Sequence, residues 1–458
     1  MAKPSPDELR ESVHGVVITP GDEEYDEARK VYNAMIDRRP AAIVRVANAG
    51  DVMASVGFAR GGRLDLAVRG GGHSAPGFGT CDDGVVIDFS GLRGVRVDPR
   101  SRTARVDAGA TWADLNAATY AFGLAVTGGI ISTTGIAGLT LGGGFGHVAR
   151  GLGLTCDNLL SADVVTADGR FLVASEQENA DLFWALRGGG GNFGVVTSFE
   201  YRLHPLKDIY GGLLFYELDD AGTILRFYRD FIADAPWQLS VFPGFHIAPP
   251  LPFIPENRHG DHFIALICCW AGPPEEAERA VRPLFDVAPV VAAHVGPMPY
   301  PAINSAFDAL LPPGLQQYWK GLFATELTDA AIDAHLEHGP LVPTVNSTMH
   351  MYPINGACHQ PDPDASAWSY RDANFATVIA GAWPDPDDNK TNMEWVRLYH
   401  EALAPHSEPG GYVNFTSEDD QGRSQVQANY KGHYERLAEI KRTYDPDNLF
   451  HLNHNIEP

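Results

Sequence analysis

The stretch Arg69-Gly70-Gly71-Gly72-His73-Ser74 constrains the fold of this chain more than any other. It follows a mostly apolar run, residues 64–68, that predicts a buried strand. Because glycine has no Cβ, three glycines in a row let the backbone turn tightly and approach a ligand closely. The N–H groups of such a turn can form a concave site for a diphosphate, with the histidine beside it. Taken alone, His73 could equally be a structural histidine that bonds to loop carbonyl groups.

Two more glycine-rich runs follow this turn, at residues 134–146 and 186–196. Residues 112–120 predict a helix. Three short β patterns precede that helix, at residues 85–89, 95–97 and 103–107. This irregular mixture of short strands and helices predicts an α+β fold, and not the regular alternation of a doubly wound sheet.

The chain of 458 residues changes in composition after His204-Pro205-Leu206, which predicts a domain boundary. We expect a first domain over residues 1–205, with its core at about 36–205. A second domain over 206–407 is expected to form an antiparallel sheet backed by helices. The last segment, 408–458, is expected to return to the first domain.

Hydrophobic patterning places the elements of the second domain and of the two ends. The second domain is expected to contain helices near 219–234, 274–286 and 328–338 and strands near 208–217, 262–269, 318–326, 346–354 and 374–382. Residues 8–39 predict a helical lead-in. The tail predicts a strand from residue 411 and one helix over 426–444.

The net charge of −24 at pH 7 argues against nucleic acid and anionic membranes as partners. No run of about 18 apolar residues occurs, and residues 1–13 lack the apolar core of a signal segment. We therefore expect a cytoplasmic protein that does not contact a membrane. The five cysteines are odd in number and lack metal-ligand spacing, which predicts reduced, buried thiols and no metal site.

Four motifs, spread over nearly the whole chain, form one set. They are Arg69-Gly-Gly-Gly-His-Ser, Gly142-Gly-Gly-Phe-Gly followed by Gly151-Leu-Gly-Leu-Thr-Cys-Asp-Asn, Leu186-Arg-Gly-Gly-Gly-Gly-Asn-Phe-Gly-Val-Val and Lys441-Arg-Thr-Tyr-Asp-Pro-Asp-Asn-Leu-Phe. With them the chain resembles the FAD-linked oxidases of the berberine-bridge-enzyme-like group, in the vanillyl-alcohol-oxidase superfamily. Within this group it is most similar to the bacterial 6-hydroxy-nicotine-oxidase-like branch. The resemblance implies a PCMH-type FAD-binding domain in the first half.

The resemblance also implies roles for particular residues. His73 would carry the 8α-methyl group of the flavin through a covalent bond, and Asn414 would reach the isoalloxazine ring from the tail. The backbone near Val196 would meet the adenine end. The cofactor contacts implied in this way are Arg69, Gly70, Gly71, Gly72, His73, Ser74, Gly77, Thr134, Gly135, Gly138, Gly144, Gly146, Asp157, Val196 and Asn414.

Three positions bear on how far the family pattern holds. Many relatives form a second bond from a cysteine to flavin C6, but Ile131 stands at that position, and Cys156 belongs to another motif. We therefore expect one covalent link, through His73, and no second cysteinyl link. Phe415 stands where plant relatives carry a tyrosine that can act as a base, so that hydroxyl group is missing. Thr134 stands at the position that governs oxygen access in the family.

Two patterns in the second domain suggest contacts with a substrate. In Met349-His350-Met351-Tyr352, the period of two puts His350 and Tyr352 on one face of a strand. Tyr318 and Lys320 likewise share a face, and we expect both to contact the substrate. Tyr352, Tyr412 and His350 are the acid–base or orienting candidates, in that order. Alternatively, these polar faces are simply solvated, because polar-out alternation is usual in antiparallel sheets.

The expected activity is a two-electron oxidation of a small organic substrate by covalently bound FAD, because a flavin supplies the electron sink and needs few protein groups. The substrate would be an alcohol, an amine or a sugar, and O₂ the acceptor, giving H₂O₂. Three alternatives stay open: a dehydrogenase that uses another acceptor, an oxidative cyclase of secondary metabolism, and a flavin-binding protein without catalysis. No oligomeric state is predicted.

Overall fold

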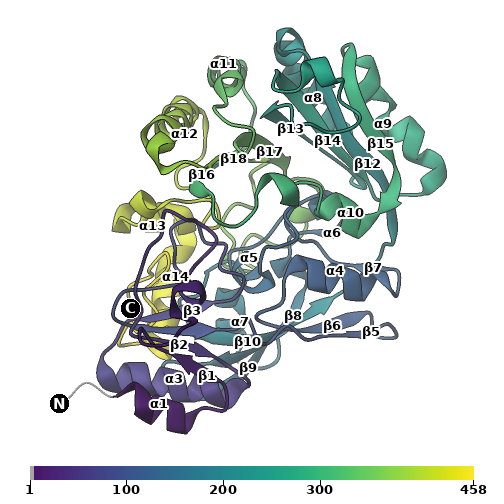
Figure 1. The fold of residues 1–458 in the computed structure, drawn as a ribbon. Helices are drawn as coiled ribbons and strands as arrows, with labels where there is room; N and C mark the ends of the chain where they lie inside the picture. Colours follow the sequence, from purple (N-terminus) through teal and green to yellow (C-terminus); the bar gives the residue numbers. More distant parts are fainter. Residues whose placement is uncertain (1–4) are drawn as a thin grey trace.

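The computed structural model describes residues 5–458, and three smaller sheets form the lower half of the view in Figure 1. Their strands are β1 (Val16–Ile18), β2 (Ala42–Arg45), β3 (Leu66–Arg69), β4 (Val85–Asp88), β5 (Val95–Asp98), β6 (Thr103–Asp107), β7 (Leu124–Ala125), β8 (Leu159–Val165), β9 (Phe171–Ser175), β10 (Val195–Arg202) and β11 (His204–Pro205). The orders are β1-β2-β4-β3, β5-β6-β10-β8-β9 and β11-β7. Strand β4 pairs in parallel with both β2 and β3.

A seven-stranded sheet forms the upper half of the same view. Its strands are β12 (Asp208–Tyr216), β13 (Leu239–Ile247), β14 (His262–Trp270), β15 (Val290–Pro299), β16 (Gln316–Ala324), β17 (Thr348–Pro353) and β18 (Phe375–Trp383). They lie in the order β15-β12-β14-β13-β17-β18-β16, and every pair is antiparallel. The predicted α+β class, with an antiparallel sheet backed by helices, is confirmed.

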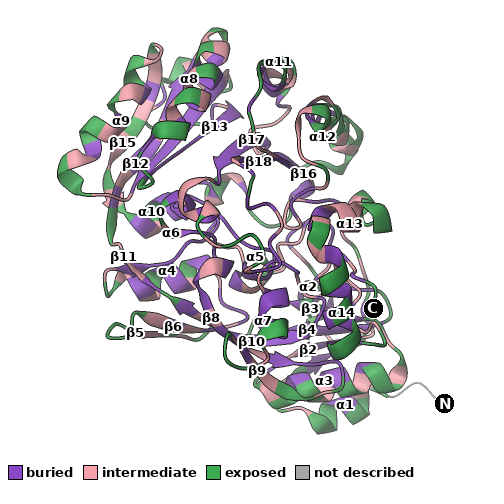
Figure 2. Cartoon of the chain, turned by 180° about the vertical axis from the view of Figure 1, so that it is seen from behind, coloured by how far each residue is buried: buried purple, intermediate pink, exposed green. Residues whose placement is uncertain are grey.

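Four helices cover the outer face of this sheet: α8 (Ala221–Asp234), α9 (Ala277–Asp286), α11 (Asp329–His338) and α12 (Asn389–Leu403). Their apolar sides and the outward strand residues, including Met349 and Met351, form one core. Figure 2 shows the strands buried and the outer sides of these helices exposed. The inner face of the sheet looks toward the lower half, where a separate core cluster includes Tyr352, Val378 and Phe145. The site described below lies against this inner face.

The remaining helices belong to the lower half and to the connections. They are α1 (Pro6–Ser12), α2 (Tyr25–Ala28), α3 (Ala49–Gly62), α4 (Trp112–Tyr120), α5 (Ile136–Leu141), α6 (Ala149–Leu152), α7 (Ala180–Leu186), α10 (Tyr300–Asn304), α13 (Arg423–Tyr430) and α14 (Tyr434–Tyr444). Helix α4 has the predicted bounds because Thr111 and Asp114 form a capping box at its start. No helix among residues 5–458 is long and apolar enough to cross a membrane.

Both ends of the chain differ from the sequence-based expectation. The lead-in is not a long helix: α1, β1 and α2 are short and are followed by an irregular segment to residue 41. In the tail, residues 411–416 form no strand. The helix expected over 426–444 is two helices, because Lys431 adopts a left-handed φ of 46° between α13 and α14. Polar patterning alone does not reveal such a break.

Strands β13 and β15 and helix α12 were not predicted from the sequence. The pair Pro243-Gly244 in β13 disfavours a strand, since proline cannot donate to the ladder. It is tolerated because β13 pairs with β17 only at Gly244 and Phe245. Strand β15 contains Pro297 and Pro299 and lies at the edge of the sheet, where proline is acceptable.

Candidate active site

A cavity of about 330 Å³ lies between the glycine turns and the inner face of the seven-stranded sheet. It runs from the end of β3 to strands β13, β16, β17 and β18. The residues of the first half that line it are Phe89, Ala108 and residues within 66–79, 129–145 and 190–196, and the tail contributes 412–415, Tyr430 and residues within 450–454. The cavity therefore joins segments that are far apart in the sequence, as the set of motifs predicts.

The glycine turn after β3 presents a row of backbone donors along this cavity. Residues 70–74 all line it, and among the described residues none of their N–H groups donates a hydrogen bond to the protein. A Cβ on Gly71 would lie 2.3 Å from the backbone nitrogen of Gly135, so the two turns touch. A Cβ on Gly138 or Gly191 would meet nothing within 4 Å. The turn thus offers unused donors, and the two other glycine runs leave open space at Gly138 and Gly191, an arrangement that fits a diphosphate.

His73 stands at the centre of this turn, and its ring is held on three sides. Its Nε2 lies 3.1 Å from Thr133 Oγ1, and its Nδ1 lies 3.3 Å from Thr134 Oγ1. The ring of Tyr32 stacks on it at 3.7 Å between centroids. Removal from water lowers the pKa of His73 to about 3. The imidazole is therefore neutral at pH 7 and has a free nitrogen lone pair.

Arg69 lies at the cavity wall, but its guanidinium group points away from the turn. Its Nη2 lies 3.1 Å from Asp88 Oδ2 and donates to the Ala28 carbonyl at 2.7 Å, and its Nη1 donates to the Lys30 carbonyl. The side chain is buried. Because its charge is paired, Arg69 fixes the lead-in beside the turn, and the backbone of the following glycines is left to face a ligand.

Four of the expected cofactor contacts do not line the cavity: Gly77, Gly144, Gly146 and Asp157. The three glycines allow close packing, because a Cβ would clash with Ile36 at Gly77, with Thr155 at Gly144 and with the Gly128 carbonyl at Gly146. Asp157 forms an ion pair at 2.5 Å with Arg371, which is distant from it in the sequence. At these four positions the structure shows a packing or ion-pair role, and contact with the cofactor stays a prediction.

The other expected contacts, namely Thr134, Gly135, Gly138, Val196 and Asn414, do line the cavity. Asn414 donates from Nδ2 to the Leu139 carbonyl at 3.2 Å and to the Tyr412 hydroxyl at 2.8 Å. That hydroxyl also accepts from the Gly144 N–H at 2.9 Å. Tyr412 and Asn414 therefore brace each other against the second glycine run, although the segment is not a strand.

His350 and Tyr352 face the cavity from β17, as the period of two predicts. His350 Nδ1 lies 3.1 Å from the Tyr352 hydroxyl oxygen. On its other side, His350 Nε2 lies 3.0 Å from Nε2 of His246, which comes from β13 and also lines the cavity. Burial lowers the pKa of His246 to about 4. Burial, and repulsion from a charged His246, lower the pKa of His350 well below its ordinary value. Burial raises the pKa of Tyr352.

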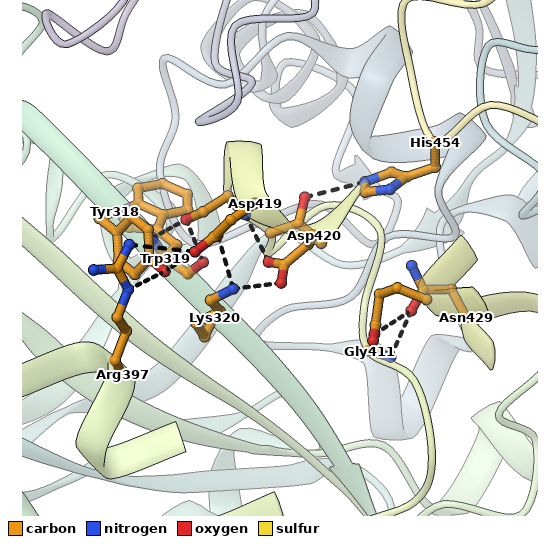
Figure 3. Close-up of polar contacts among 12 residues, drawn as sticks. Tyr318, Trp319, Lys320, Arg397, Gly411, Asp419, Asp420, Asn429 and His454 are labelled. Carbon is orange, nitrogen blue, oxygen red and sulfur yellow. Dashed lines mark hydrogen bonds and ion pairs between the residues drawn. The ribbon is translucent and has the colours of Figure 1, made fainter. Parts of the chain in front are cut away.

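Tyr318 and Lys320, the two expected substrate contacts, do not line the cavity. In the sheet, Ala380 pairs with both Trp319 and Thr348, which puts Trp319 on the same face as the cavity residues of β17. Tyr318 and Lys320 consequently point to the opposite face. There the Tyr318 hydroxyl donates to Asp419 at 2.7 Å, and Lys320 bonds to Asp419 and Asp420 (Figure 3).

None of the five cysteines, all buried and reduced, lines the cavity. Ile131 does line it, at the position where many relatives carry the second flavin-linking cysteine. No cluster of metal-ligating side chains occurs among residues 5–458.

Sequence reasoning missed several residues of the site. His246 lines the cavity but lies in a strand whose proline and glycine disfavour a strand prediction. Tyr32, which stacks on His73, lies in the irregular lead-in. His454 packs near the chain end, where its Nε2 lies 3.0 Å from Thr416 Oγ1 and from the Val413 carbonyl. Gly191 and Asn192 belong to the third glycine run, and that run was the one available signal.

Two segments of the chain match known protein families. Residues 40–175 match the model for an FAD binding domain, and residues 411–457 match the model for berberine and berberine-like proteins. An FAD-linked oxidoreductase of Dictyostelium discoideum is 32% identical over 98% of this chain and 96% of its own. The chain belongs to the berberine-bridge-enzyme-like family.

Two further relatives of this family cover the whole fold. The (R)-6-hydroxynicotine oxidase of Paenarthrobacter nicotinovorans is 30% identical over 98% of this chain and 97% of its own. The crystal structure of 6-hydroxy-D-nicotine oxidase from Arthrobacter nicotinovorans matches with a TM-score of 0.87 and 26% identity, covering 100% of both chains. This berberine-bridge-enzyme-like protein is an FAD-dependent oxidoreductase, and its cavity carries the unused backbone donors that FAD requires.

Proposed function

We propose that the protein is a covalently flavinylated oxidase that removes two electrons from a small organic substrate and passes them to O₂, giving H₂O₂. One observation carries the proposal. A single cavity joins a row of unused backbone donors, at residues 70–74, to a buried group of titratable side chains on the inner sheet face. A cofactor at one end and a substrate at the other would meet inside it. FAD held there supplies the two-electron acceptor.

The proposed link to FAD is single and runs through His73. Its support is chemical: the ring is neutral, fixed by Thr133, Thr134 and Tyr32, and lines the cavity. A neutral imidazole has the lone pair that bond formation to the 8α carbon needs. Because no cysteine lines the cavity, a second thioether bond has no donor there.

The candidate acid–base residues differ in whether they have a lone pair free to accept a proton. The Tyr412 oxygen already accepts from Gly144 and Asn414, which uses both of its acceptor positions. We therefore assign Tyr412 an orienting role. Tyr352 keeps an acceptor position on the cavity side, and we propose that it handles the proton of the substrate, with His350 bonded behind it. FAD would be held by the segments 1–205 and 408–458, and substrate mainly by 206–407.

The test uses the purified holoenzyme and a panel of alcohols, amines and sugars. Peroxide release with at least one compound, together with flavin reoxidation that is fast in air and absent under argon, is the expected result. Rapid reoxidation by a quinone or a dye, but not by air, would instead make the protein a dehydrogenase. A product mass that shows a new ring would indicate an oxidative cyclase. If no compound reduces the flavin, the proposed activity is wrong.

A further inference from the structure

His246, His350 and Tyr352 form an unbroken chain of polar atoms on the inner sheet face. The contact between two Nε2 atoms, at 3.0 Å, requires one imidazole to donate and the other to accept. If His350 donates to His246, then His350 Nδ1 is an acceptor and takes the Tyr352 hydroxyl hydrogen at 3.1 Å. In this arrangement the Tyr352 oxygen keeps its lone pairs for a further donor.

The local backbone is built to bring the two histidines together. A Cβ on Gly244 would lie 2.6 Å from His350 Cδ2 and 2.8 Å from His246 Nε2, so a larger residue there would displace the pair. The ring centroids of Phe242 and Phe307 lie 5.1 Å and 5.2 Å from that of His350. Both histidines are more than nine-tenths buried. The chain of contacts is therefore dry and close-packed.

The cavity offers no partner for a charged substrate. No aspartate, glutamate or lysine lines it, and its one arginine, Arg69, is paired with Asp88. Around Tyr352 the wall is aromatic and apolar, with Phe145, Trp319 and Phe415. An ammonium group would be buried here without a counter-ion, which is costly.

We propose that Tyr352, His350 and His246 form a proton relay that accepts the hydroxyl proton of a neutral aromatic alcohol. This assigns His246 a role in moving the proton and narrows the substrate class. The relay rests on the oxidation proposed above and adds to it. Cationic amines are excluded as good substrates.

The relay step balances as follows. The substrate O–H proton passes to the Tyr352 oxygen, the Tyr352 proton passes to His350 Nδ1, and the His350 Nε2 proton passes to His246 Nε2. The substrate C–H hydrogen leaves with its electron pair to the flavin, and a C=O bond forms. His246 ends as an imidazolium, and the electron pair passed to the flavin leaves the compensating negative charge in the same cavity. A weakly basic acceptor suffices, because the hydroxyl group becomes strongly acidic as the C–H bond breaks.

The substrate class is tested by binding. The holoenzyme is titrated with para-methoxybenzyl alcohol and with para-methoxybenzylammonium, which share one shape, and the change in flavin absorbance is measured. We expect the alcohol to bind at least about tenfold more tightly, because the ammonium lacks a counter-ion. Equal or tighter binding of the ammonium, or no binding of the alcohol, overturns the assignment.

The relay is tested by anaerobic stopped-flow reduction of the flavin, with the best alcohol from the panel. His246→Asn keeps an acceptor for His350 but cannot take the proton. We expect its reduction rate to fall about a hundredfold, with little change in alcohol affinity and with loss of the solvent deuterium isotope effect. His335→Asn is the matched control, because His335 is also buried and bonded to a tyrosine, Tyr399, but lies outside the cavity.

The possible results distinguish a failure of the proton relay from a failure of the proposed oxidase function. An unchanged rate and isotope effect in His246→Asn overturn the relay, and so does the absence of any alcohol that reduces the flavin. If an amine or a sugar reduces the wild-type flavin and alcohols do not, the oxidase stands and the relay falls. A wild-type flavin that no compound reduces overturns the proposed function itself.

Discussion

At the scale of single residues, the account depends on how the His73 ring is held. The histidine and the glycine turn were predicted from the motif, and both line the cavity. The stacking partner, Tyr32, could not be predicted, because it lies in an irregular segment with no pattern of its own. The period of two put His350 and Tyr352 on one face of a strand and Tyr318 and Lys320 on one face of another. Only the first pair lines the cavity, because the period gives two faces and does not say which one is inward.

Tyr32 provides the first prediction. Tyr32→Leu removes the ring that stacks on His73, so the imidazole loses one of its three supports. We expect a smaller fraction of protein with covalent flavin, measured as the absorbance retained after denaturation and precipitation. Tyr32→Phe keeps the stack and loses only the hydroxyl contact with the Leu311 carbonyl, so it should retain its flavin. Equal covalent flavin in both variants would contradict the role of the stack.

At the scale of elements, β13 is a strand that its sequence does not predict. Its proline and glycine argue against a strand, yet Gly244 is the residue that lets β13 and β17 bring His246 and His350 into contact. Three of the four helices behind the sheet (α8, α9 and α11) and five of its seven strands were predicted, because their apolar periods are regular. The break between α13 and α14 was not, since it depends on one left-handed residue.

Gly244→Ala tests this element directly. The added methyl group must displace a histidine, which we expect to cost about 1–3 kcal/mol of unfolding free energy and to slow flavin reduction. Gly296→Ala in β15 is the control, because its Cβ would meet nothing within 4 Å. Thermal unfolding and stopped-flow reduction are compared for the two variants. A Gly244→Ala protein that matches the control in both would contradict the packing described here.

The tail segment 411–420 is held to β16 by charge. Lys320→Met leaves Asp419 and Asp420 without their shared cation, and we expect a loss of about 1–3 kcal/mol of unfolding free energy. Limited proteolysis should then cut this segment faster. Lys390→Met, at an exposed position on α12, is the control and should leave the cleavage rate unchanged. Equal cleavage rates would show that the ion pairs do not hold the tail.

At the scale of the whole molecule, the division into residues 1–205 with 408–458 and residues 206–407 stays a prediction. The seven-stranded sheet lies entirely within 208–383, which is consistent with it. The cavity between the two halves could be inferred only from the family resemblance. Nothing in composition or periodicity says which sheet face covers which glycine turn, because that depends on packing between distant segments.

Buried neutral histidines give the molecule a pH-dependent stability. Burial lowers the pKa of His147, His246 and His454 to about 4, from the ordinary value of 6.5. The unfolded chain takes up these protons first, so stability is complete above pH 6.5 and falls as the pH drops toward 4. Each histidine contributes roughly 1.4 kcal/mol per pH unit in that window. Thermal unfolding of the wild type and of His147→Phe should show a shallower fall in the variant, and equal slopes would contradict this cause.

The central claim is that one FAD is bonded to this protein at His73 and nowhere else. Mass spectrometry of the denatured holoenzyme, followed by digestion, tests it most directly. We predict an added mass of one FAD, carried by the peptide that contains His73, and no flavin on any cysteine peptide. Denatured protein without added mass, or flavin attached to a different residue, would contradict the claim.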